Sequence, residues 1–126
     1  MKQHQLCDIL STTPDLELAI LIGSRAATTA LPNSDWDIAL QWVRSMGFVE
    51  QLAATELFRG TVANKLGVPE HAVDLIDLPT AGLTMRAVVA EEGVPLKGSD
   101  SLAWHRFLKR TWRELEEHYW EQTYAA

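Results

Sequence analysis

The stretch Gly23–Leu40, GSRAATTALPNSDWDIAL, decides the fold, because it joins two predicted strands through a glycine-serine turn. Directly before it lies the apolar run Leu16–Ile22, LELAILI, which follows Pro14 and has the length of a strand. A short apolar run bounded by proline and glycine is typical of a buried strand. After a Pro-Asn turn signal, the alternating segment Asp35–Trp42 predicts a second strand.

Two aspartates in this stretch share one face of the second strand. Because side chains alternate along a strand, Asp35 and Asp37 point the same way, about 6.6 Å apart, whereas Trp36 and Ile38 point the other way. Neighbouring carboxylates repel each other unless a cation or a proton compensates their charge. Mg²⁺ suits such oxygen ligands, because it takes one or two carboxylates together with substrate phosphates. The alternative is that both aspartates are solvated residues at a strand edge.

Two further features would complete such a site. Gly23-Ser24 lies where the first strand ends and a short helix begins, a place where backbone N–H groups receive an anion closely. A third predicted strand, Ala72–Leu78, offers Asp74 and Asp77 on opposite faces, so only one of them can join, and periodicity alone does not choose. We favour Asp74, because it lies deeper in the strand and farther from the turn that follows.

The remaining segments are predicted to be mostly helical. Apolar spacing and stop signals predict helices over Lys2–Leu10, Phe48–Leu66 and Leu83–Glu92, a short extended piece at Val94–Lys97 and a last helix over Ser101–Tyr119. Strands that alternate with helices in this way indicate a small sheet covered by helices, of α/β or α+β type.

The last predicted helix has an apolar face whose members are spaced four, four, three and four residues apart: Trp104, Leu108, Trp112, Leu115 and Tyr119. We expect most of this face to pack in the core and Ser99 or Asp100 to cap the helix. Trp120 and Tyr124 lie off that face and are candidates to anchor a partner. The basic residues of the same helix are expected to be solvated: Arg106, Lys109, Arg110 and Arg113.

Composition limits the class of protein. A chain of 126 residues that is 47% hydrophobic and 22% charged has the balance of one soluble globular domain. Its net charge of -6 disfavours direct binding to nucleic acid and suits a basic partner protein. The one cysteine, Cys7, cannot form an internal disulfide, and we expect it to pack as a small hydrophobe. No stretch matches a signal peptide or a membrane span, so a cytoplasmic location without membrane contact is expected.

The pattern Gly23-Ser24, ten residues, then Asp35-x-Asp37 resembles the signature of the DNA polymerase β-type nucleotidyltransferase superfamily. From the first strand to RAVVAEEGVPLKG, the chain is similar to the minimal nucleotidyltransferases (MNT), antitoxins that act beside HEPN-domain toxins in prokaryotes. The resemblance implies a nucleotidyltransferase fold of α+β type with α/β character, a small mixed sheet flanked by helices. Residues 1–126 would form one minimal domain that ends in a helix. Many members continue the turn with Ala-Arg-Gly, which this chain lacks, and that leaves open whether Arg25 replaces their arginine.

The resemblance also implies the roles of the candidate residues. Gly23 and Ser24 would bind the phosphates of ATP, and Asp35 and Asp37 would hold Mg²⁺. Asp74 matches the third catalytic carboxylate, which helps to hold the metal and to deprotonate the attacking hydroxyl. The implied activity is transfer of AMP from ATP to a tyrosine hydroxyl of the cognate HEPN ribonuclease toxin, which it neutralises within a hetero-oligomer.

Two other functions remain open at this point. A chain with this fold could neutralise a toxin only by masking its surface, without catalysis. It could instead be a small-molecule nucleotidyltransferase, although no second domain is available to shape a pocket for a large acceptor.

Overall fold

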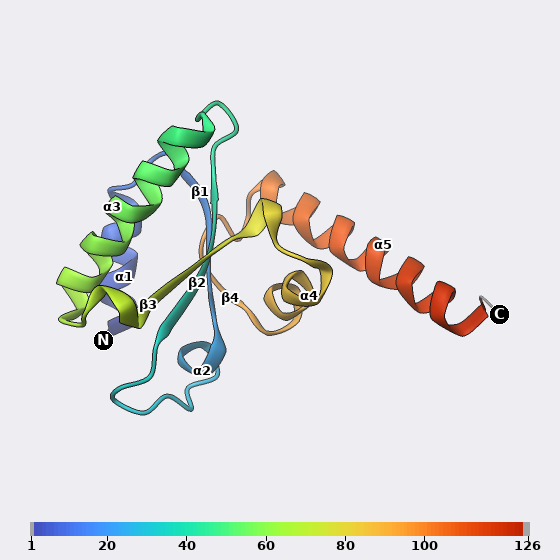
Figure 1. Cartoon of the computed structure of the whole chain (residues 1–126), viewed down its shortest axis with the longest axis horizontal. Coiled ribbons are helices and arrows are strands. Elements are labelled where there is room, and N and C mark those ends of the chain that lie inside the picture. Colours follow the sequence, from blue (N-terminus) through green and yellow to red (C-terminus); the bar gives the residue numbers. More distant parts are fainter. Residues whose placement is uncertain (1, 125–126) are drawn as a thin grey trace.

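The computed structural model describes residues 2–124 and contains a four-stranded sheet with helices on both faces (Figure 1). In chain order the elements are α1 (Lys2–Ser11), β1 (Leu16–Ile22), α2 (Gly23–Ala26), β2 (Trp36–Trp42), α3 (Phe48–Leu66), the 3-10 turn η1 (Glu70–Ala72), β3 (Val73–Asp77), the 3-10 turn η2 (Leu78–Thr80), α4 (Leu83–Glu92), β4 (Val94–Lys97) and α5 (Leu102–Tyr124). This architecture confirms the predicted fold class.

The sheet has the strand order β3-β2-β1-β4 and mixes two kinds of pairing. β1 is antiparallel to β2 and to β4, whereas β2 and β3 are parallel. Parallel neighbours need a crossover connection, and α3 supplies it. β1 lies inside the sheet and is buried along nearly its whole length, which explains why its sequence is apolar at almost every position.

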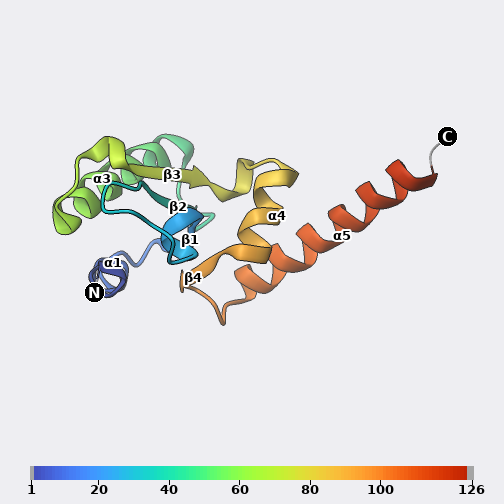
Figure 2. The same ribbon diagram turned by 90° about the horizontal axis from the view of Figure 1, so that it is seen from below.

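Helices cover the two faces of the sheet in pairs (Figure 2). α1 and α3 pack on one face, over a core that includes Ile38 and Phe58. α4 and α5 pack on the other face, over a core that includes Ile20 and Val89. Along β2 the even-numbered residues belong to the first core, so Asp37 points to the face that carries α4 and α5.

Most element boundaries agree with the predicted ones. β1, α3, α4 and β4 have the predicted bounds, and β3 is one residue shorter at each end. β2 begins at Trp36, so that Asp35 stands just before the strand.

The prediction that Cys7 packs as a small hydrophobe is wrong, because Cys7 is exposed on α1. Within residues 2–124, no helix has an apolar stretch that could cross a bilayer.

The prediction for the C-terminal helix is partly wrong. Its buried side chains are Trp104, Phe107 and Thr111, which follow each other at intervals of three and four residues. Trp112 and Tyr119, expected in the core, are 43% and 62% exposed. Trp112 is exposed because the buried face runs through Trp104, Phe107 and Thr111, and one further residue turns the side chain about 100° around the helix, away from that face. Tyr119 is exposed because the sheet and α4 lie under the first half of α5, and the second half extends past them (Figures 1 and 2).

The start of α5 also differs from its prediction. The cap is Ser101, whose Oγ accepts a hydrogen bond from the backbone N–H of Trp104 at 3.1 Å, in place of Ser99 or Asp100. The Ser101 N–H in turn donates to the carbonyl of Gly98, whose φ of +84° closes the turn after β4.

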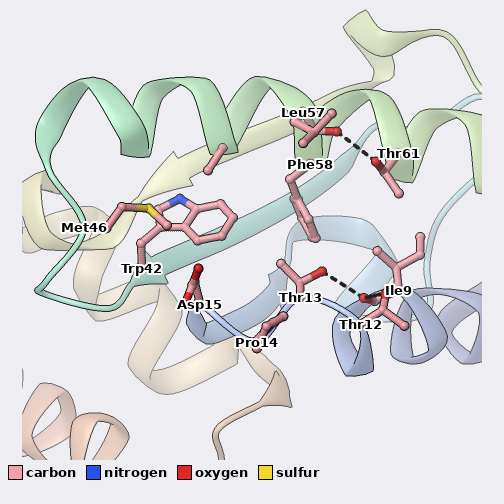
Figure 3. A pocket seen from close by; sticks show the side chains of 11 residues that line it. Ile9, Thr12, Thr13, Pro14, Asp15, Trp42, Met46, Leu57, Phe58 and Thr61 are labelled. Atoms are coloured by element: carbon pink, nitrogen blue, oxygen red, sulfur yellow. Dashed lines mark hydrogen bonds between the residues drawn. The ribbon is translucent and has the colours of Figure 1, made fainter.

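A pocket of about 360 Å³ lies between α1 and α3, at the end of the sheet that is remote from Asp37 (Figure 3). Trp42 and Phe58 form part of its wall, with their rings 6.3 Å apart and perpendicular. The hydroxyl of Thr61 donates to the carbonyl of Leu57 within α3. The pocket is therefore mainly a gap in the first core, and it contains none of the predicted site residues.

A buried arginine ties α4 to α5. Arg86 is 7% exposed, and its guanidinium donates two hydrogen bonds to the Glu114 carboxylate, at 2.9 and 3.2 Å. Its Nε donates to the carbonyl of Ala81 at 3.1 Å, so the buried cation is well satisfied. The hydrogen bond from Arg86 lowers the pKa of Glu114 below its ordinary value.

We expect Arg86→Met to lower the Tm at neutral pH by about 5 °C, because it keeps an apolar stem but removes the hydrogen bonds to Glu114 and Ala81. Since the pKa of Glu114 is lowered in the folded chain, its contribution is present at neutral pH and is lost as the pH falls through that lowered pKa. Thermal melts of the wild type and of Arg86→Met from neutral to acid pH measure the difference in Tm. A Tm difference that stays constant over this range would contradict a contribution from the Glu114 carboxylate.

Candidate active site

The candidate site lies at the end of the sheet where β1 finishes and β2 begins. This end carries α2 and is at the bottom of Figure 1. Ile22, the last residue of β1, pairs with Asp37 across the antiparallel ladder. Asp37 in turn pairs with Asp74 across the parallel ladder. Directly paired residues point to the same face of a sheet, so the carboxyl groups of Asp37 and Asp74 stand side by side.

Gly23 brings the turn after β1 into contact with the Asp37 carboxylate. Its φ is +73°, a conformation that side chains rarely adopt. A Cβ at this position would stand 2.5 Å from Oδ2 of Asp37, closer than any real Cβ contact. Only glycine therefore satisfies both the backbone conformation and the close approach.

The electrostatics of the site are those of crowded negative charge. Burial raises the pKa of Asp37, and the charges of Asp74 and then Asp35 raise it further. A hydrogen bond between the carboxyl groups of Asp37 and Asp74 acts in the same direction. Each of these effects disfavours the charged form of Asp37 until a proton or a cation compensates it.

The three predicted carboxylates are not equally placed. Asp37 is half-buried, whereas Asp74 and Asp35 are exposed. Within the described part of the chain, no three Asp, Glu, His or Cys side chains already stand in an arrangement that could hold a metal ion. The structure thus brings Asp37 and Asp74 together and leaves Asp35 beside them, at the entry to β2. The donor chemistry fits Mg²⁺, because only oxygen ligands are present and their charge is uncompensated.

Asp77 lies on the opposite face of β3 from this cluster. It pairs in register with Leu40, which belongs to the core under α1 and α3. Its Oδ2 accepts a hydrogen bond from the hydroxyl of Thr80 at 2.7 Å. Asp77 therefore serves the turn after β3, and Asp74 is the aspartate of this strand that faces Asp37.

Arg25 contributes to the site indirectly. Its Nη2 donates to the carbonyls of Ser34 at 2.9 Å and Pro32 at 3.3 Å. Its guanidinium lies over the ring of Trp36, 4.4 Å from the centroid. Because these contacts hold the backbone just before Asp35 and the side chain just after it, Arg25 is a positioning residue. Sequence reasoning missed this role, since nothing in the local sequence links Arg25 to a loop nine residues later.

Ser24 is half-buried in the first turn of α2, next to Gly23. The first N–H groups of a helix have no acceptor within it, so they are available to an anion. Such donors would lie near the carboxylates of Asp37 and Asp74, since Gly23 contacts Asp37.

Comparison with known proteins identifies related sequences and structures. The family described as polymerase beta, nucleotidyltransferase matches residues 4–102. No protein of curated function matches the chain.

Several solved structures share the fold. A toxin-antitoxin crystallised with AMP-PNP has a TM-score of 0.71 at 24% identity, covering 99% of this chain and 94% of that chain. The toxin-antitoxin MntA-HepT gives 0.65 at 23% identity over 98% and 92% of the two chains. A complex of a tri-AMPylated HEPN toxin from Shewanella oneidensis with an MNT antitoxin gives 0.64 at 22% identity over 99% and 94%. At these identities the likeness establishes the fold.

We expect Asp37→Asn to raise the Tm by a few degrees in metal-free buffer at neutral pH, because it removes a half-buried charge that Asp74 and Asp35 repel. A raised pKa in the folded chain means that the charged form costs stability above that pKa and costs nothing in acid. The gain should therefore vanish as the pH falls, which thermal melts would show. Asp77→Asn, on the opposite face of the same sheet, should give no gain, and equal behaviour of the two variants would contradict this electrostatic account.

We expect Gly23→Ala to destabilise the fold by about 1–2 kcal/mol, because alanine resists the positive φ and its Cβ displaces the Asp37 carboxylate. Gly82→Ala is the matched control, since Gly82 has a φ of -70° and no atom within 4 Å of an added Cβ. Chemical denaturation of the two variants measures the difference. The account is wrong if both substitutions cost the same.

Proposed function

The chain belongs to the polymerase beta nucleotidyltransferase family, and we propose that it transfers AMP from ATP to a tyrosine hydroxyl of a HEPN ribonuclease toxin. In this proposal the chain is an antitoxin, and the covalent AMP neutralises the toxin. The observation that carries the proposal is the Asp37 and Asp74 pair, held in register beside the Gly23 turn. A pair of carboxylates next to a turn that opens a helix suits a nucleotide that brings both phosphate and cation.

The proposed roles follow from the placement of each residue. Asp35, Asp37 and Asp74 would hold Mg²⁺, which when bound neutralises charge on the phosphates and lowers the pKa of the acceptor hydroxyl. Gly23 and Ser24 would hold the phosphates through N–H groups of the first turn of α2. Their contribution is to fix the nucleotide so that its α-phosphate faces the acceptor.

The proposed transfer is a substitution at the α-phosphorus of ATP. The tyrosine oxygen forms a bond to the α-phosphorus, while the bond from that phosphorus to the bridging oxygen breaks and pyrophosphate leaves. The hydroxyl proton must be accepted by a base. Asp74 suits this role, because it is exposed and adjoins Asp37.

The exposure of the site favours a macromolecular acceptor. Asp74 and Asp35 are both open to solvent, so a tyrosine on the surface of another protein can reach them. The related solved structures support the same choice: one holds AMP-PNP, and another contains a HEPN toxin that is tri-AMPylated.

The proposal predicts that a HEPN protein encoded beside this chain gains the mass of one or more AMP groups on incubation with the chain, ATP and Mg²⁺. Intact-mass spectrometry measures the gain. We expect Asp35→Asn to slow transfer at least roughly a hundredfold, because a metal ligand is lost at the transition state. Asp77→Asn, which alters the opposite face of the sheet, should leave the rate unchanged.

Other outcomes would identify the alternatives. An unchanged mass in a stable complex of the two proteins would overturn transfer and favour neutralisation by masking. Transfer of AMP to small hydroxyl compounds, with none to the protein, would favour a small-molecule nucleotidyltransferase.

A further inference from the structure

The second half of α5 projects from the body of the protein (Figures 1 and 2). Within residues 2–124, Thr111 is the last buried side chain of this helix, and Glu114, bound by Arg86, is the last residue whose side chain bonds to α4. The ten residues from 115 to 124 extend about 15 Å farther. A helical segment of this length is marginal in water by itself, so a packing partner would stabilise it.

One face of α5 combines opposite charges and aromatic rings. Its members are spaced four, three, four, three and four residues apart, the spacing at which one helix faces another. All of them are exposed: Arg106, Arg110, Arg113, Glu117, Trp120 and Tyr124. The rings of Trp120 and Tyr124 stack with their centroids 4.3 Å apart, which presents a flat aromatic surface. This row, here called the mixed face, is cationic in its first half and acidic and aromatic in its second.

A groove of about 870 Å³ runs beside the first half of the mixed face. Arg106 and Arg110 line it from α5, and Arg44 lines it from the end of β2. Its acidic residue, Glu17, already accepts a hydrogen bond from Gln41 at 3.0 Å. Within residues 2–124, neither Arg44 nor Arg106 takes part in an ion pair. The groove is therefore suited to an occupant that is acidic and aromatic.

We propose that this occupant is the second half of α5 from a second copy of this chain, so that two copies pair through antiparallel α5 helices. With the two-fold axis at Leu115, each residue of the mixed face meets one of complementary chemistry on the other copy. The pairs are Arg113 with Glu117, Arg110 with Trp120 and Arg106 with Tyr124.

The chemistry of these pairs explains the arrangement. Arg113 and Glu117 form an ion pair, while Arg110 and Arg106 place guanidinium groups against aromatic rings. Two-fold symmetry repeats each pair, so every contact counts twice. A parallel arrangement would instead set arginine against arginine and glutamate against glutamate, which the shared charge disfavours. Charge complementarity thus selects the antiparallel second copy.

Oligomeric state across the micromolar range, measured by sedimentation equilibrium on the full chain, tests the proposal. The wild-type chain should be a dimer that weakens as salt rises, because salt screens exposed charge pairs. Arg113→Glu, and separately Glu117→Lys, should each give monomers. Each change sets like charges against each other across the helix pair.

Mixing the two charge variants supplies the decisive result. In a heterodimer of one copy of each variant, every altered pair again joins opposite charges, so an equimolar mixture should recover the dimer. A single chain that carries both substitutions should recover it as well. Failure of both rescues, with the helix content of each variant unchanged by circular dichroism, would overturn the antiparallel pairing.

A pair of aromatic substitutions provides a further check. Trp120→Ala with Tyr124→Ala should weaken the dimer roughly thirtyfold or more, since large aromatic side chains dominate protein interfaces. Phe48→Ala with Val49→Ala removes two exposed apolar side chains on α3 and should leave the dimer intact. A wild-type chain that stays monomeric, or equal loss in both double variants, would refute the proposal. Asp35→Asn should dimerise like wild type, which keeps this test independent of AMP transfer.

Discussion

The close approach of Gly23 to the Asp37 carboxylate is the constraint on which the site depends. It requires a positive φ at the end of β1, and it requires that no side chain occupy that position. Because Asp37 also pairs with Asp74, the same contact links the turn, β2 and β3 at one end of the sheet. This arrangement crowds negative charge. Burial and the neighbouring carboxylates of Asp74 and Asp35 therefore raise the pKa of Asp37. A bound cation or proton would relieve this repulsion.

The two faces of the sheet have different tasks. The face under α1 and α3 is a continuous apolar core, and the even-numbered side chains of β2 are buried in it. The other face holds a smaller core under α4 and α5 and carries Asp37 and Asp74 at its edge. Arg86 secures α5 to this second layer through Glu114, and beyond that ion pair the helix leaves the body. One helix thus closes the core with its first half and presents a mixed face with its second.

Alternation and apolar runs were sufficient to predict most of the fold. LELAILI is buried as β1 because both faces of that strand are covered, and the alternation of Asp35, Trp36, Asp37 and Ile38 correctly separates the carboxylates from the core. The same kind of reasoning failed for α5. Its leucine and aromatic spacing predicts a buried face, but burial needs a partner surface: Thr111 is fully buried, whereas Trp112 and Tyr119 are 43% and 62% exposed. Hydrophobic spacing shows which residues share a face and does not show how far the opposing surface extends.

The sequence by itself determined most strands and helices, the Gly-Ser turn and the separation of Asp37 from the apolar side chains of β2, because each depends on local backbone geometry with a fixed period. Only the tertiary structure decided between Asp74 and Asp77, since the parallel register of β2 with β3 sets Asp74 beside Asp37. It also decided the role of Arg25, which depends on a loop that folds back over α2. Register and loop closure depend on contacts between segments far apart in the chain, and a local pattern carries no information about them.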